Sequence, residues 1–115
     1  MRKYLNAIAI LFLLIQISCS PSKDKDLNAK VGVSGSIVEI KNDDQFDYTN
    51  CKLTLNDSYE LTGIEIKKGE SVKIFLTDFT DETGVRFGTN QKALSLEIWC
   101  EIPDGGHGFY LGDWK

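Results

Sequence analysis

The chain of 115 residues carries 13 lysines and arginines against 17 aspartates and glutamates, which gives a net charge of −4, and it contains one histidine. This acidic balance excludes the electrostatic binding of nucleic acid, which requires a basic surface. The length is that of one small domain with a modest hydrophobic core.

The amino terminus has the pattern of a secretory signal. Two cations, Arg2 and Lys3, precede an apolar run from Ala7 to Ile15, and the small residue Ser18 follows. Spanning a bilayer takes about 20 apolar residues, so this run is too short to be a transmembrane helix. A charged start, a short apolar run and a small residue at the cleavage position together predict a signal peptide over residues 1–18.

Cys19 stands directly after the expected cleavage position. The segment Ile17-Ser18-Cys19 resembles the signal of bacterial lipoproteins, although Gln16 occupies a position where that family usually carries leucine. The resemblance implies that Cys19 becomes the new amino terminus and that its sulfur takes a diacylglycerol, with fatty acids such as palmitate inserted in the membrane. It also implies a bacterial cell-envelope protein held at the outer membrane. The alternative is an ordinary secreted protein cut nearby, in which Cys19 has no such role.

The mature chain divides into a tether and a domain. Removing 18 of 115 residues leaves 97, with 11 cations against 17 acids, a net charge of about −6. Residues 19–29 are small, polar and charged, with almost nothing to bury, and we expect a flexible tether there. Residues 30–115 form the expected folded domain.

From Lys30 onward the hydrophobic pattern has a period of two. Short alternating runs separated by turn residues predict about seven strands, at 31–33, 36–41, 46–56, 59–67, 71–76, 93–102 and 109–115, and no amphipathic helix. This pattern predicts an all-β domain, a small antiparallel β-sandwich, with a small barrel as the alternative. The order of the run Ile37–Asn42, an aromatic and acidic turn, and the later run Lys68–Val72 resembles small immunoglobulin-like domains of bacterial envelope proteins. That resemblance implies a fold and no particular activity.

Two cysteines remain after Cys19 is assigned to the lipid. Cys51 shares a strand face with Leu53 and Leu55, and Cys100 falls in phase with the apolar positions of its own strand, so both are expected to face the core. Disulfides persist in the cell envelope, and we therefore predict a Cys51–Cys100 bridge. Two buried free thiols are the alternative.

The aromatic residues near the carboxyl terminus provide the candidate binding surface. Trp99, Tyr110 and Trp114 occupy the phase opposite the expected core positions, and we predict that they share an outward face. Such a face suits a protein partner or the rings of a glycan. Two alternatives stay open: these side chains pack inward, or Phe109 and Leu111 form the outward pair.

The remaining polar groups do not form a recognisable catalytic or metal-binding set. Asp78–Gly84 contains three carboxylates, but their spacing misses the calcium-binding EF-hand pattern, and a solvated turn is the simpler interpretation. His107, within Gly-Gly-His-Gly, has no marked nucleophile or second metal ligand to accompany it. We expect no metal, no cofactor and no enzymatic activity. The sequence predicts a membrane-anchored, non-catalytic protein-interaction or accessory module, with a glycan-binding module as the alternative.

Overall fold

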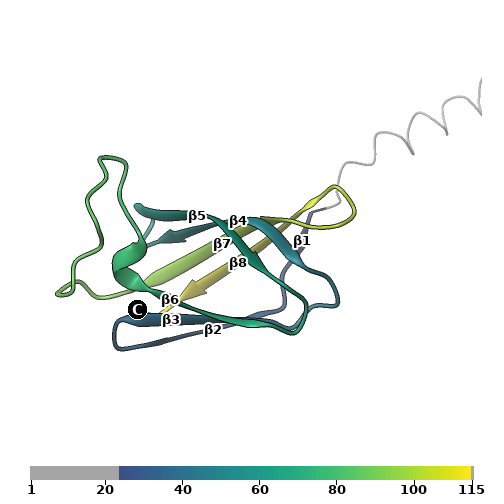
Figure 1. The fold of residues 1–115 in the computed structure, drawn as a ribbon, viewed down its shortest axis with the longest axis horizontal. Helices are drawn as coiled ribbons and strands as arrows, with labels where there is room; N and C mark the ends of the chain where they lie inside the picture. The colour runs from purple at the N-terminus through teal and green to yellow at the C-terminus, as the bar shows by residue number, and fades with distance from the viewer. Residues whose placement is uncertain (1–23, 115) are drawn as a thin grey trace, which may run out of the picture.

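Residues 24–114 are described by the computed structural model, and they form two β-sheets that pack face to face (Figure 1). One sheet has five strands, in the order β1 (Lys25–Asp26), β8 (His107–Asp113), β7 (Ser95–Glu101), β4 (Tyr48–Leu55) and β5 (Tyr59–Ile66). The other has three, in the order β2 (Ala29–Ser34), β3 (Ile37–Asn42) and β6 (Ser71–Phe75). The predicted all-β sandwich is confirmed, with eight strands among the described residues where about seven were expected.

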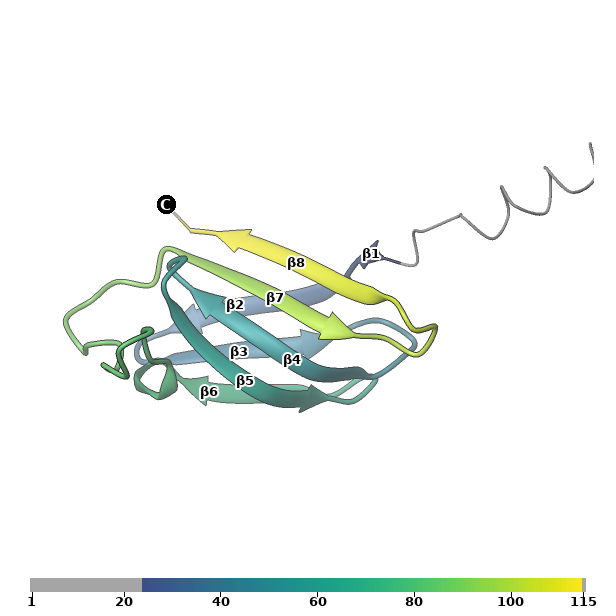
Figure 2. The ribbon, with the colours of Figure 1, turned by 90° about the horizontal axis from the view of Figure 1, so that it is seen from above.

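The two layers bury the side chains that alternate along their strands. Figure 2 shows the five-stranded sheet lying over the three-stranded one, with the strands of both layers running in similar directions. Neighbouring strands pair antiparallel except β1, which runs parallel to β8. The order β8-β7-β4 in one sheet and β3-β6 in the other matches the G-F-C and B-E order of immunoglobulin-like sandwiches. The fully buried core includes Val38, Ile40, Leu53, Leu55, Leu96 and Ile98.

A bulge between β4 and β5 shifts the alternation of both strands. Gly63 has no partner between the pairs Thr62 with Lys52 and Ile64 with Cys51, and its φ of 76° is one that glycine adopts without strain. The alternation of β5 therefore changes phase at Gly63. On the opposite strand, the irregularity around Asn50, whose φ is 49°, allows Tyr48 to point into the core.

The connection between β6 and β7 contributes two aromatic rings to the core. A short 3-10 helix, Leu76–Asp78, is followed by Phe79 and Phe87, both fully or almost fully buried. The Phe87 ring meets Tyr59 edge-on, with the ring centroids 5.1 Å apart. The sequence pattern predicts only a connection here, because the residues between the two phenylalanines are polar or glycine apart from Val85 and show no strand or helix periodicity.

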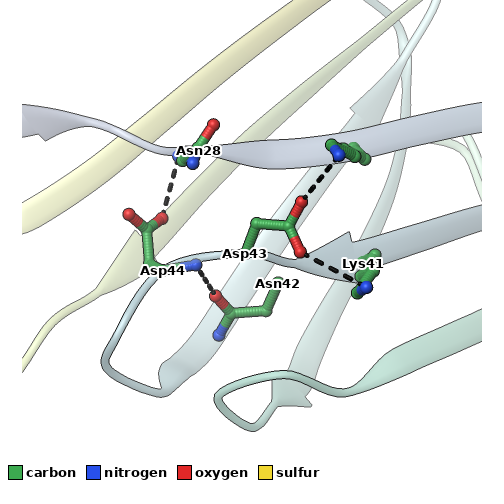
Figure 3. A network of polar contacts seen from close by, with 6 residues as sticks. Asn28, Lys41, Asn42, Asp43 and Asp44 are labelled. Atoms are coloured by element: carbon green, nitrogen blue, oxygen red, sulfur yellow. Dashed lines mark hydrogen bonds and ion pairs between the residues drawn. The ribbon is translucent and has the colours of Figure 1, made fainter.

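A buried amide fastens the two sheets at one end of the sandwich. Asn42, at the end of β3, is fully buried, and its Nδ2 donates hydrogen bonds to the carbonyl oxygens of Phe46 (2.8 Å) and Ile66 (3.0 Å). Its Oδ1 accepts a hydrogen bond from the backbone N–H of Asp44 at 2.9 Å (Figure 3). Since Ile66 belongs to β5, this side chain links the three-stranded sheet to the five-stranded one.

Asp44 extends this network to the amino-terminal segment. Its Oδ2 accepts a hydrogen bond from the backbone N–H of Asn28 at 2.8 Å (Figure 3). The same oxygen accepts a hydrogen bond from the hydroxyl of Tyr48 at 2.6 Å. Burial and the hydrogen bond to Asp44 raise the pKa of Tyr48, so the hydroxyl stays a donor. The contact to Asn28 fixes the start of β2 against the turn that follows β3.

Residues 25–29 belong to the sandwich, which corrects the expectation of a flexible tether over 19–29. Lys25 and Asp26 pair with β8, and the N–H of Leu27 donates to the carbonyl of Phe109 at 2.8 Å. Leu27 is buried, as the single large apolar side chain of a polar segment, and it covers Gly108. One buried leucine and an available strand edge thus order the segment. Residues 19–23 lie outside the described part of the chain.

We predict that Gly108→Ala lowers the free energy of unfolding by about 1 to 3 kcal/mol, the range of overpacked sites. A Cβ at position 108 would clash with Leu27, lying 2.8 Å from its Cγ, and would lie 3.3 Å from Cγ2 of Ile102. Urea denaturation measures the change. Gly32→Ala is the matched control, because an added Cβ there meets nothing within 4 Å. The double variant Gly108→Ala/Leu27→Ala should lose less free energy of unfolding than the sum of the losses in the two single variants. Additive losses would contradict the proposed contact between the two positions.

We predict that Asn42→Ala destabilises the domain by about 3 kcal/mol, because it leaves the buried carbonyl of Ile66 and the partly buried backbone groups of Phe46 and Asp44 without their partner. Thermal and urea unfolding of the variant measure the loss. Asn90→Ala is the control, since Asn90 is exposed in a turn, and it should change stability by no more than about 0.5 kcal/mol. Equal effects of the two substitutions would show that the amide network contributes nothing.

Candidate functional site

The outer face of the five-stranded sheet carries a group of exposed and half-buried aromatic and apolar side chains. On β8 the odd-numbered residues His107, Phe109 and Leu111 point outward, because Gly108 and Gly112 between them are buried. Trp99 on β7 lies directly opposite Phe109 and is 40% exposed, and Leu111 is 58% exposed. We name the four residues Trp99, His107, Phe109 and Leu111 the aromatic strip.

A stacked pair of rings orders one end of the aromatic strip. The rings of Trp99 and His107 are nearly parallel, with an angle of 16° and a centroid distance of 4.7 Å. His107 is also held by Asp24, whose Oδ1 accepts a hydrogen bond from the His107 backbone N–H at 3.1 Å and lies 3.7 Å from Nδ1. These contacts hold the indole in one orientation before any partner arrives.

The prediction that Trp99, Tyr110 and Trp114 share an outward face is wrong for Tyr110 and Trp114. Tyr110 lies opposite Ile98, a core residue, and its ring covers Gly112, where an added Cβ would lie 2.9 Å from the hydroxyl oxygen. Trp114 also packs against the core, and its backbone N–H donates to the carbonyl of Leu94 at 2.7 Å. Trp99 does point outward, and the alternative register, with Phe109 and Leu111 outward, is confirmed.

Carboxylates border the aromatic strip along both neighbouring strands. Asp26 on β1 is in register with Phe109, and on β7 Glu97 is in register with Leu111. Within residues 24–114, neither of these two carboxylates makes a side-chain hydrogen bond or an ion pair. Glu101, opposite His107, accepts a hydrogen bond from the Asn50 amide at 2.8 Å. The face therefore combines apolar rings with negative charge.

On the outward face of the sheet, the cation in register with the strip is itself paired. Lys52 on β4 lies opposite Trp99, and its Nζ is 3.3 Å from the Glu60 carboxylate on β5. This exposed pair contributes little to stability, but Glu60 neutralises the positive charge of Lys52. The outward face of the sheet thus stays acidic around the rings.

Cys51 and Cys100 lie side by side beneath the same face. Both are fully buried, as predicted, on the neighbouring strands β4 and β7, and both are free thiols in this structure. The side-chain contact with Cys100, together with burial, raises the pKa of the Cys51 thiol. The two cysteines lie next to the registered pair Lys52 and Trp99, at the point where the ladder between β4 and β7 is irregular. A disulfide requires Cα atoms about 4.4 to 6.8 Å apart, a separation that neighbouring strands provide.

We predict that the protein contains the Cys51–Cys100 disulfide when it is exported to an oxidising compartment. A thiol count on the denatured, unreduced protein should then find neither cysteine free, and finding both free would overturn the prediction. On the chain-entropy model the bridge, which closes a loop of about 50 residues, adds about 4 kcal/mol to the free energy of unfolding. Comparing oxidised protein with the Cys51→Ala/Cys100→Ala variant by urea denaturation measures this gain.

The acidic segments are organised as turns. Oδ1 of Asp81 accepts hydrogen bonds from the Thr83 hydroxyl (2.7 Å), the Thr83 N–H (2.9 Å) and the Val85 N–H (2.9 Å), which lowers the pKa of Asp81. Asp43 pairs with Lys30 at 3.3 Å and Lys41 at 3.6 Å (Figure 3). Among residues 24–114, no group of three histidines, cysteines, aspartates or glutamates is placed to hold a metal ion.

The comparisons with known proteins do not supply a family. No family model, no curated protein and no solved structure matched the chain. In the stretch from residue 24 to 114, no helix is long and apolar enough to cross a bilayer. Cys19 and the predicted signal peptide lie outside the described residues, so their assignment stays a prediction from the sequence.

Proposed function

We propose that this chain is a lipoprotein of the bacterial cell envelope, anchored through Cys19 at the outer membrane, whose sandwich acts as a non-catalytic protein-interaction or accessory module. The observation that carries the proposal is the aromatic strip, in which Trp99 and Leu111 stay exposed on a flat sheet face. Exposed aromatic residues are enriched at the energetic centres of protein interfaces.

The strip has two properties of a binding surface. Its rings stand on paired strands instead of loops, and Trp99 is held by its stack on His107. Ordering side chains on binding costs about 0.5 to 1.5 kcal/mol for each flexible side chain, so a prearranged ring avoids part of that cost. An exposed cluster of apolar groups with a polar border is typical of interaction sites.

The position of the strip also suits a partner at the membrane. Asp24, which holds His107, follows Cys19 by five residues, and five extended residues reach at most about 18 Å. A lipid on Cys19 would therefore keep the His107 end of the strip within about 18 Å of its attachment point. A partner embedded in or attached to the same membrane lies within that reach.

We predict that a photoreactive p-benzoylphenylalanine in place of Leu111, in the full chain in its native envelope, captures one protein at least about tenfold more efficiently than the same group in place of Phe75. Phe75 is the matched control, because it is 56% exposed but belongs to the other sheet. Capture is measured by immunoblotting and mass spectrometry. Trp99→Ala should reduce it by about tenfold, and Cys19→Ser should reduce it by releasing the protein from the membrane.

Equal capture from both positions would contradict the proposal. A glycan ligand must be distinguished from a protein partner, since aromatic rings beside carboxylates also suit sugars. Titrating envelope polysaccharide fragments while following tryptophan emission distinguishes the two. A spectral shift that Trp99→Phe abolishes, without capture of a protein at position 111, would replace the protein partner by a glycan.

A further inference from the structure

The borders of the aromatic strip carry a charge that nothing in the described chain neutralises. Asp26 and Glu97 lie on opposite sides of β8, one beside Phe109 and the other beside Leu111, and neither has an ion-pair partner among residues 24–114. From the spacing of strands and residues, their Cα atoms are about 12 Å apart, with the apolar side chains between them. Resting on the function proposed above, we propose that the strip binds a cationic segment of a protein partner, rich in arginine or lysine.

Arginine and lysine match both parts of this surface. Their aliphatic stems can lie along Phe109 and Leu111 while their charged groups reach the carboxylates of the border. A guanidinium also stacks on an indole ring such as that of Trp99 and forms paired hydrogen bonds with a carboxylate such as Glu97. A partner with acidic or purely apolar groups here would leave both carboxylates uncompensated in the interface, which costs free energy.

The opposite face of the sandwich is less acidic. The outward residues of β2, β3 and β6 include Lys30, Lys41 and Lys73 with a single carboxylate, Glu39, and the adjoining Asp43 pairs with both Lys30 and Lys41. A cationic segment therefore meets a more acidic surface at the strip than on this weakly basic face, so the charge pattern favours the strip. Phe75, on the basic face, lacks such an acidic border, although its exposure is similar to that of Leu111.

The test uses the full chain in its native envelope, with p-benzoylphenylalanine in place of Leu111 as the probe. In this background Asp26→Asn/Glu97→Gln should lower the yield of the captured protein at least about tenfold at fixed expression, because the isosteric changes remove charge alone. Glu39→Gln, on the basic face, is the matched control and should leave the yield unchanged. Raising the salt from 50 to 500 mM in isolated membranes should lower the yield of the parent protein and affect the neutralised variant less.

Mass spectrometry of the cross-linked peptides identifies what the strip contacts, and partner peptides rich in arginine or lysine are expected. Capture at Leu111 that is insensitive to charge and salt, or that maps to acidic or neutral partner peptides or to lipid, would overturn the cationic segment. With a protein captured, such a result leaves the interaction module in place. Failure of the interaction module itself is a different result, namely equal capture at positions 111 and 75.

Discussion

The buried amide of Asn42 is the constraint on which the relative placement of the two sheets depends. A buried polar group left without a partner costs about 1 to 3 kcal/mol, more than a satisfied one contributes, so its partners must all be in place in the native state. Those partners come from the turn after β3, at Asp44 and Phe46, and from the end of β5, at Ile66. One side chain therefore specifies how the end of each sheet lies against the other, which apolar contacts alone, being non-directional, do not.

A series of contacts connects this amide to the aromatic strip. The turn that Asn42 fixes presents Asp44 to the backbone of Asn28, and this contact determines where the chain enters β2. Just before it, Leu27 packs on Gly108 and β1 pairs with β8. Pairing at that edge brings Asp24 to His107, on which Trp99 is stacked. The orientation of an exposed indole thus depends on a polar network that links the two sheets.

The sequence pattern predicts which residues of a strand face inward where the two faces of the strand differ in polarity. It fails where both faces are apolar. From Leu94 to Ile102 the apolar and polar positions alternate, so the inward direction of Cys100 followed from the pattern. Along β8 both phases carry aromatic or apolar residues, so periodicity cannot choose between Phe109 and Tyr110. The deciding residues are Gly108 and Gly112, whose missing side chains leave room for Leu27 and for the Tyr110 ring. Such complementarity between distant residues is visible only after folding.

The cysteine pair and the strip occupy opposite sides of the same strand. Cys100 follows Trp99 directly, so the thiol lies beneath the sheet and the indole above it, and Cys51 lies beside Cys100 on β4. A bridge there would join β4 to β7 next to the bulge at Asn50, where the ladder between these strands is irregular. Ordering a flexible surface on binding costs free energy. A disulfide at this irregularity would make the aromatic strip more rigid before binding and so reduce that cost. Stability and recognition would then both depend on β4 and β7. Along β7 the outward Trp99, which would contact a partner, stands next to the inward Cys100, which belongs to the core.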